Sequence, residues 1–300
     1  MKCNQDYTHI ICDLSDVIVK GLEGSESKIS AYLNEDIKEV RNKLFSYNFN
    51  DLWLGKKREF DFFDLLIKEF NWKINTNELL GIIRSNFQEI NGSKEVFREL
   101  SKHYKLILLS VNPVEWAEYY LNKFKLNEIF RDDIYFSYQI GYTKREQESF
   151  MYIIEKYKIN PSNILFIDDS KRNNSIAKSI GITGICFQNP IQLTIELSKL
   201  NIKGAEEILR KLLLNKVEES LNSIIISREN IEIRENTELT SDLSAKIGYM
   251  DRLFIILEEY FNISIRHFVI EHPVFFKVSD LLDVMIREIK KKQLKSALIN

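Results

Sequence analysis

The chain of 300 residues has few of the residues that break or cross-link a fold, with 3 cysteines, 4 prolines, 4 histidines and 10 glycines. The three cysteines are widely spaced and form no Cys-x-x-Cys pair, which excludes a disulfide framework and a cysteine-based zinc or redox motif. Cys12 and Cys186 both lie in apolar runs. We therefore expect these thiols to be small buried side chains rather than catalytic groups.

Long hydrophobic runs and an excess of one charge are also lacking. No stretch reaches the roughly 18 uncharged apolar residues of a membrane span, and the first residues lack the apolar run of a signal peptide. We therefore expect a cytoplasmic protein without a membrane partner. The 42 Lys and Arg residues nearly balance 44 Asp and Glu residues, so the net charge of -2 gives no general attraction to nucleic acid. An anionic ligand must be bound by a local site.

Apolar and aromatic residues are plentiful. A hydrophobic content of 44% with 19 Phe and 13 Tyr excludes intrinsic disorder, and the length favours about two domains. After a first apolar strand that ends near residue 13, short apolar runs alternate with helical patterns. The runs lie at 106–109, 134–136, 164–167 and 182–187, and the helical patterns at about 93–102, 113–124, 146–157 and 171–179. This alternation predicts an α/β fold with a doubly wound parallel sheet in residues 1–200.

Residues 20–91 interrupt the alternation, because their aromatic and aliphatic side chains recur only at helical spacings. We predict a helical cap inserted after the first strand, leaving a core of residues 1–19 and 92–200. The glycines at its ends suit hinges and plain turns equally well; they are Gly21, Gly24 and Gly92. Trp53 and the Lys56–Arg58 run are candidates for substrate specificity, although three adjacent cations more often form a solvated face.

From residue 201 onward only helical patterns remain, at about 205–222, 250–261 and 279–290. Their apolar residues fall on one side of each helix. Residues 201–300 are therefore predicted to form an all-α helical bundle with a core of its own.

Polar residues stand where the predicted strands end. Asp13 ends the first strand, Ser110 follows the second, and Asp168 with Asp169 follows the fourth; Lys144 lies just beyond the third. The carboxyl ends of parallel strands meet at one edge of a sheet, where ligands bind. Clustered carboxylates at such an edge predict a divalent cation.

This order of residues resembles the haloacid dehalogenase-like hydrolase superfamily over residues 7–195, and most closely its phosphatase-like members with a helical cap. The resemblance implies a Rossmann-like core in which Asp13 is the nucleophile and forms an aspartyl phosphate with a small phosphorylated metabolite. The remaining catalytic residues would be Ser15, Ser110 and Lys144. The cofactor would be Mg²⁺, held by Asp13, Ser15 through its backbone carbonyl, Asp168 and Asp169. The phosphate would be bound by Ser110, Asn112 and Lys144.

Each of these residues also fits a structural role when taken alone. Ser110 could cap the helix that follows Pro113, and Lys144 could be a solvated surface residue. Asp168-Asp169-Ser170 could simply begin the next helix, since acidic residues stabilise a helix N-terminus. The four positions together, in this order, favour the site.

Ser15 departs from the resembled pattern, because the phosphatases carry there a second Asp that acts as general acid and base. A hydroxyl has no pKa near 7, so a factor of about 10²–10⁴ in rate would be missing. Asp16 could substitute only if the loop is twisted, because adjacent side chains of an extended segment point to opposite sides. Arg145 stands where Pro commonly follows the Lys, and would add a phosphate contact or lie on the surface.

We therefore expect a weak Mg²⁺-dependent phosphatase. The alternative is a catalytically degenerate binding or scaffold protein. Dehalogenation is disfavoured, because the dehalogenases of the superfamily need no metal and do not keep the acidic pair that is present here.

The segment that ends in Glu258-Glu259-Tyr260-Phe261 resembles part of an acyl carrier protein, and this resemblance covers residues 205–292. The serine that carries phosphopantetheine aligns with Ile247 and its preceding Asp with Lys246, which implies a carrier-shaped domain without the prosthetic group. Ser244, three residues early, is a weaker attachment point. A protein of a carrier pathway would then be a partner, and acyl or glyceryl transfer to a carrier a further alternative. A generic helical bundle is favoured over a specific carrier role.

Overall fold

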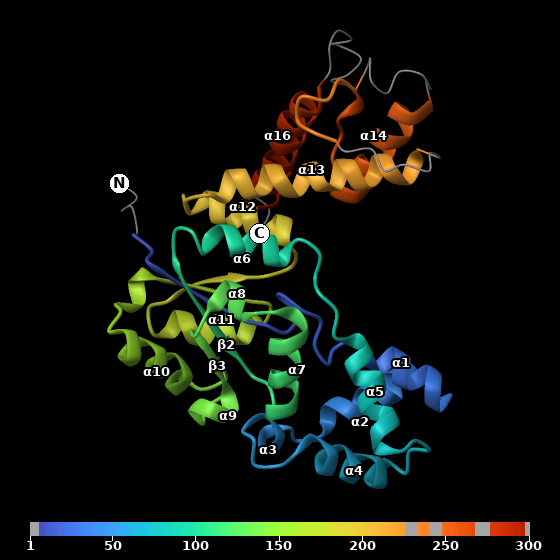
Figure 1. Cartoon of the computed structure of the whole chain (residues 1–300), viewed down its shortest axis with the longest axis vertical. Coiled ribbons are helices and arrows are strands. Elements are labelled where there is room, and N and C mark those ends of the chain that lie inside the picture. Colours follow the sequence, from blue (N-terminus) through green and yellow to red (C-terminus); the bar gives the residue numbers. More distant parts are fainter. Residues whose placement is uncertain (1–5, 226–232, 240–247, 268–276, 298–300) are drawn as a thin grey trace. The chain divides into compact units, whose positions relative to one another are not determined.

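The structure, a computed structural model, describes residues 6–225, 233–239, 248–267 and 277–297 (Figure 1). The chain divides into two compact units, Met1–Glu196 and Leu197–Asn300. The residues that decide the acyl-carrier prediction, Ser244, Lys246 and Ile247, lie outside the described residues.

A five-stranded parallel sheet forms the centre of the first unit, with the strand order β3-β2-β1-β4-β5. The strands are β1 (His9–Cys12), β2 (Lys105–Ser110), β3 (Ile134–Phe136), β4 (Ile164–Asp168) and β5 (Thr183–Cys186). Cys12 at the end of β1 lies opposite Leu108 of β2 and Ile167 of β4. The chain therefore builds outward from β1 on one side and then on the other. The carboxyl end of β1 is the switch point at which ligands bind in such sheets.

The strands are short apolar runs because both faces of the sheet are covered. Ile10, Ile11 and Cys12 of β1 are fully buried, as are the first four residues of β4. On one face, Phe150 packs edge-on against Phe166 of β4 with ring centres 5.0 Å apart. The predicted α/β fold with a parallel sheet is confirmed.

The core helices follow the predicted pattern to within about two residues at each end. They are α6 (Ser93–Leu100), α7 (Val114–Phe124), α10 (Gln147–Tyr157) and α11 (Lys171–Ser179). The sequence prediction missed α8 (Asn127–Phe130), α9 (Ser137–Ile140) and the 3-10 helix η1 (Pro161–Asn163), because a single turn is too short for a helical period to show. It also missed α12 (Pro190–Lys199), whose start is marked by Asn189, which accepts a bond from Gln192 N at 2.9 Å, and by Pro at the first position.

Five helices are inserted between β1 and α6, as predicted for this segment. They are α1 (Ser25–Leu33), α2 (Ile37–Ser46), α3 (Asn50–Trp53), α4 (Glu59–Phe70) and α5 (Thr76–Asn86), coloured blue to cyan in Figure 1. The entering and leaving chains run side by side, because Lys20 N donates to Gln88 O at 2.7 Å and Ile90 N donates to Ile18 O at 2.9 Å. The insertion is thus joined to the sheet by one paired neck.

The second unit is helical in its described residues, with α13 (Ala205–Ile224), α14 (Gly248–Phe261) and α16 (Val278–Ala297). Leu213 of α13, Leu253 of α14 and Leu281 of α16 are fully buried. Arg210 of α13 pairs with Asp283 of α16 at 2.5 Å. Among the helices that the structure describes, in either unit, none has the length and apolar character to cross a membrane.

A buried carboxylate ties the inserted helices to the core. Glu59, at the start of α4, accepts a hydrogen bond from Trp116 Nε1 of α7 at 2.7 Å and pairs with Arg84 of α5. Glu59 is 6% exposed and Trp116 is 1% exposed. Hydrogen bonds to a charged group in such a place contribute more than neutral ones, typically about 1.5 to 3 kcal/mol.

We expect Glu59→Ala to lower the free energy of unfolding by about 2 to 3 kcal/mol, because it leaves a buried indole N–H without its acceptor. Urea unfolding followed by tryptophan fluorescence measures the change. Asp61→Ala is the matched control: Asp61 lies in the same first helical turn but is exposed, so its loss should stay within about 0.5 kcal/mol. Equal losses in the two variants would contradict the role given to Glu59.

Candidate functional site

Asp13 lies at the centre of the site, where the chain leaves β1. Its backbone N–H continues the pairing with β4 by donating to Ile167 O at 2.9 Å. Its side chain is 6% exposed. Carboxylate oxygen Oδ1 accepts from Leu14 N at 2.6 Å and from Ser110 Oγ at 3.0 Å, while Oδ2 lies 2.5 Å from Lys144 Nζ. Both oxygens are thus fixed in direction by groups from two further parts of the chain.

Lys144 is buried, not a surface lysine, with 3% of its surface exposed. It follows α9 in a turn in which Glu146 accepts from Thr143 N at 2.8 Å. Its ammonium group bridges Asp13 and Asp168, since Nζ also lies 2.6 Å from Asp168 Oδ2. Flanked by two carboxylates, Lys144 has its pKa raised by their charges even though burial acts in the opposite direction.

Ser110, the last residue of β2, and Asn112 form the side of the site next to that strand. The Ser110 hydroxyl donates to Asp13 and accepts from Asn112 Nδ2 at 2.8 Å, and Asn112 also reaches Ser15 Oγ at 3.5 Å. Both side chains are 1% exposed. Helix α7 begins after Pro113, without a side-chain cap, so Ser110 does not serve as a helix cap.

Asp168 and Asp169, the acidic pair at the end of β4, differ in burial and in hydrogen-bond partners. Asp168 is fully buried and accepts from Lys144, from Ser170 N at 2.9 Å and from Asn173 Nδ2 at 3.1 Å, while Asp169 is exposed. Ser170 caps α11 by accepting from Asn173 N at 3.3 Å. The sequence prediction missed Asn173. Its only signal was its place three residues after the capping serine, where a side chain points back to the start of the helix.

Three carboxylates gather here around one ammonium group, which pairs with two of them, Asp13 and Asp168. Oxygen atoms of Asp13, Asp168 and Asp169 all lie within 4.8 Å of one another. Burial and the charges of the neighbouring carboxylates raise the pKa of Asp13 to about 7. Asp169 keeps an exposed surface but loses part of its water shell, and this loss together with the charge of Asp168 raises its pKa to about 6. A group of hard oxygen donors with surplus negative charge suits a divalent cation such as Mg²⁺.

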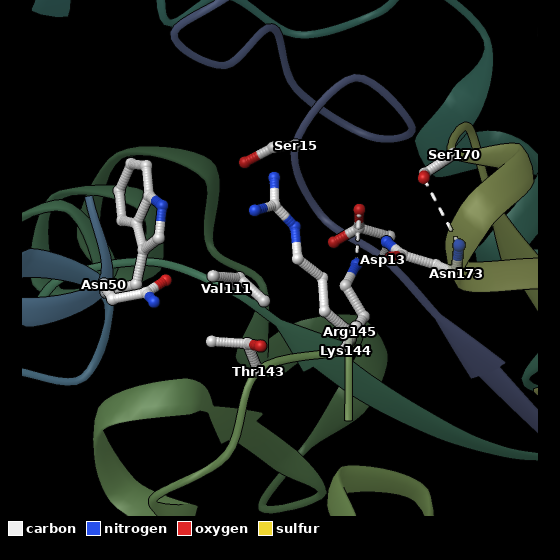
Figure 2. A pocket seen from close by; sticks show the side chains of 10 residues that line it. Asp13, Ser15, Asn50, Val111, Thr143, Lys144, Arg145, Ser170 and Asn173 are labelled. Carbon is white, nitrogen blue, oxygen red and sulfur yellow. Dashed lines mark hydrogen bonds and ion pairs between the residues drawn. The ribbon is translucent and has the colours of Figure 1, made fainter. Parts of the chain in front are cut away.

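A cavity of about 240 Å³ opens in front of Asp13 (Figure 2). Lys144, Thr143 and Ser170 line it on the core side, and Asn50 and Trp53 of α3 line it from the insertion. Figure 2 shows the Arg145 side chain crossing this space with its guanidinium group directed toward Ser15. Within the described residues Arg145 forms no ion pair. Of the predicted specificity residues, Trp53 lines the cavity, whereas Lys56, Lys57 and Arg58 do not.

The loop that carries Ser15 and Asp16 is twisted. Asp16 adopts a left-handed backbone with φ 59°, and its N–H donates to Val19 O at 2.6 Å. A methyl group at Gly21 would come within 3.1 Å of Asp16 Oδ2 and 3.3 Å of Ser15 Oγ. Both side chains therefore lie against Gly21, so the segment is not extended and the twist that Asp16 would need in order to substitute for Ser15 is present. The close approach also explains why residue 21 has no side chain.

The comparisons with known proteins agree with this geometry. The model of the haloacid dehalogenase-like hydrolase family matches residues 8–187. The chain belongs to this family of hydrolases. A D-ribitol-5-phosphate phosphatase from Bacteroides thetaiotaomicron is 29% identical over 188 residues, which span 58% of this chain and 88% of that protein. A flavin mononucleotide hydrolase from Arabidopsis thaliana is 28% identical over 120 residues, 40% of this chain and 49% of that protein.

Solved structures share the fold. An HAD family enzyme from Bacteroides thetaiotaomicron, in complex with magnesium and inorganic phosphate, superposes with a TM-score of 0.51 at 19% identity, covering 61% of this chain and 95% of that one. An HAD-like family hydrolase from Porphyromonas gingivalis gives a TM-score of 0.55 at 21% identity, covering 65% and 98%. These matches concern the first unit. They give no support to the acyl-carrier resemblance of the second unit, which stays a prediction.

The raised pKa values predict how the response to Mg²⁺ depends on pH. In the metal-free protein, protonation of Asp13 and Asp169 contributes stability that is fully present below about pH 4, the unfolded pKa, and is lost as the pH rises through 6 and 7. Because Mg²⁺ competes with these protons, the rise in Tm that it causes should be larger at pH 8 than at pH 5.5. At 100 times its Kd it should stabilise the fold by about 2.7 kcal/mol.

Thermal unfolding with and without Mg²⁺ at the two pH values measures this effect. Asp169→Asn should reduce the rise in Tm at pH 8, and Asp36→Asn, which caps α2 away from the site, should leave it unchanged. A rise in Tm that does not depend on pH would show that these carboxyls do not compete with the metal.

Proposed function

We propose that the chain is a Mg²⁺-dependent phosphatase that transfers the phosphoryl group of a small phosphate monoester first to Asp13 and then to water. The observation that carries the proposal is the setting of Asp13, which is buried at the switch point of the sheet and held between Ser110 and Lys144 beside two further carboxylates. Burial raises the pKa of Asp13 to about 7 in the metal-free protein, and a bound dication would favour the charged form, which attacks without a base.

The donor set of the site fits Mg²⁺. Asp13 and Asp169 would hold the ion with the backbone carbonyl of Ser15, and Asp168 lies within 4.8 Å of the other two carboxylates. Asp168 already accepts bonds from Lys144, Ser170 and Asn173, so its main task would be to position Lys144. When bound, Mg²⁺ supplies positive charge that offsets the charge of the phosphate. Without it, two like charges, the phosphate and Asp13, would repel each other.

The remaining side chains would bind and orient the phosphate. Lys144 would neutralise charge on both Asp13 and the transferring group, while the Ser110 hydroxyl and the Asn112 amide would turn from their present partners to the phosphate oxygens. The bond from Asp13 to phosphorus forms as the ester bond to the alcohol breaks. Water then attacks the phosphorus of the aspartyl phosphate, which releases inorganic phosphate and restores the carboxylate.

Ser15 would limit the rate, because the released alkoxide and the attacking water both need proton transfer that a hydroxyl cannot provide near pH 7. Asp16 lines the second cavity and not the one in front of Asp13, so the proton would come from solvent. A nearly inactive binding protein is the second candidate function, and Ser15 is the observation that favours it. The inserted helices, which bring Asn50 and Trp53 to the cavity, would act as the cap and exclude water.

The names of the two curated relatives suggest the type of substrate. One acts on D-ribitol 5-phosphate and the other on flavin mononucleotide. Both compounds are phosphate monoesters of the terminal hydroxyl of a ribityl chain. We propose a substrate of this kind, a phosphorylated primary alcohol of a polyol. A partner from a carrier pathway, and a carrier-shaped second unit, remain predictions from sequence.

Activity toward an aryl phosphate with Mg²⁺ should fall at least about 10³-fold in Asp13→Asn, which removes the nucleophile. Release of inorganic phosphate measures this. Equal rates in the variant and the parent chain would exclude the proposed mechanism and leave the binding protein as the better reading.

Ser15→Asp should raise the turnover of an alkyl phosphate by about 10²-fold, because it restores an acid for the leaving group. The gain should be smaller for an aryl phosphate, whose phenolate leaves without protonation. Ser15→Asn introduces a side chain of the same size as Asp but without an acidic proton, so it should give no gain in turnover. The same increase in both variants would mean that space, not proton transfer, limits the reaction.

Arg145→Ala should raise KM for a phosphate monoester about tenfold with little change in kcat, because it removes a charged donor from the cavity. Steady-state kinetics give the two constants. Arg58→Ala is the control, since the side chain of Arg58 is 82% exposed and lies outside this cavity. An unchanged KM in Arg145→Ala would place its guanidinium group outside the substrate site.

A further inference from the structure

A second cavity, of about 290 Å³, adjoins the one in front of Asp13. The two share five lining residues, which are Ser15, Asn50, Trp53, Val111 and Arg145. A phosphate held at Asp13 would therefore have its alcohol portion directed either to solvent or into this second space. Its lining decides which alcohols can occupy it.

Five of the fourteen residues that line the second cavity are aromatic. They are Phe45, Tyr47, Phe49, Trp53 and Trp116. Phe49 and Trp53 are stacked, with ring centres 5.0 Å apart and planes 18° from parallel, and Trp53 meets Trp116 edge-on at 5.5 Å. Phe62 supports Phe49 and Tyr47 from behind, at 4.8 and 5.2 Å. The rings of the wall are thus packed against one another and against Phe62. Phe45 is 42% exposed; the Arg41 guanidinium lies over its ring, 5.0 Å from the ring centre, so a ligand would meet the remaining exposed part.

The polar groups of the cavity do not suit a second phosphate. Asp16 and Glu23 line it and would repel a phosphate. Glu23 pairs with Arg41 at 2.5 Å, whereas Asp16 has only long contacts with Gly21 N at 3.4 Å and Lys20 Nζ at 3.9 Å. Side-chain amides of Asn48, Asn50 and Asn112 supply both donors and acceptors. Such a lining, aromatic with a few amides, matches a flat ring that carries nitrogen and carbonyl groups.

Arg145 stands where the two cavities meet. It lines both, and Figure 2 shows its guanidinium group beside Ser15. A planar cation at this point can donate to the phosphate or the hydroxyls of a connecting chain and can also stack on an aromatic ring. The order from Asp13 outward is therefore a phosphate site, a cation and an aromatic wall.

From this order we infer that the second cavity binds the leaving-group end of the substrate, and that this end is a flat, nitrogen-bearing aromatic ring joined to the phosphate by a short polyol or sugar. The inference rests on the proposed function and narrows it: ring-bearing 5-phosphates are preferred over ring-free polyol phosphates. Flavin mononucleotide and nucleoside 5-monophosphates share this chemistry, whereas D-ribitol 5-phosphate lacks the ring.

The test compares kcat/KM for flavin mononucleotide, AMP and D-ribitol 5-phosphate in the presence of Mg²⁺. The parent chain should prefer at least one ring-bearing substrate over D-ribitol 5-phosphate by about tenfold or more. Phe45→Ala should lower kcat/KM for the preferred ring-bearing substrate about tenfold and leave that for D-ribitol 5-phosphate within about twofold. Phe60→Ala is the matched control, because Phe60 is 47% exposed and lies outside both cavities. Comparison of kcat/KM for flavin mononucleotide and AMP shows whether the cavity prefers a flavin or a purine ring.

A preference for D-ribitol 5-phosphate, or an equal loss on all three substrates in Phe45→Ala, would overturn the inference while leaving the phosphatase proposal in place. A binding measurement without turnover tests the ring site separately from the phosphatase activity. Riboflavin and adenosine should each be titrated against tryptophan fluorescence, and the better ligand should bind more weakly to Phe45→Ala than to Phe60→Ala. Turnover of no phosphate ester together with this binding would exclude the phosphatase and keep the ring site. Absence of binding by both rings would exclude the ring site.

Discussion

The balance between one buried ammonium group and three carboxylates governs this site. Lys144 Nζ lies 2.5 Å from Asp13 and 2.6 Å from Asp168. Asp169 adds a third negative charge, and among the described residues no buried cation contacts it. The sheet makes this arrangement possible, because β1 and β4 are neighbours and release their acidic residues at the same edge. A parallel sheet thus converts two distant sequence positions into one site of surplus negative charge. That surplus suits a dication and, together with burial, raises the pKa values of Asp13 and Asp169.

The sheet, most helices and the members of the charged cluster could be predicted from the sequence because each depends on local pattern. Apolar runs of four to six residues give the strands, and the polar residue after each run gives the site. Asp13, Ser110 and Lys144 were recognisable from their position relative to those runs. Their contacts follow from the strand order, which the structure supplies, because alternation predicts a parallel sheet but not the order of its strands.

Other features depend on geometry that no local pattern records. The left-handed backbone of Asp16, which puts its side chain on the same side as that of Ser15, is set by the bond to Val19 and by the space at Gly21. Glu59 reads as an ordinary acidic residue at the start of a helix, and its bond to Trp116 joins positions far apart in sequence. The second cavity likewise requires Phe45 and Trp116, from distant parts of the chain, to line the same space. Periodicity marks such residues as buried or exposed but does not say which partners they have.

The paired neck of the insertion has an evolutionary consequence. The chain enters and leaves the five inserted helices through neighbouring backbone segments at Lys20 and Ile90. A module attached in this way can be lengthened, shortened or exchanged as a cassette without changing the register of any strand, because both of its ends are already together. Chemistry on the sheet and selectivity in the module can therefore diverge independently, so that one reaction can be offered to new molecules by replacing a single stretch of the gene.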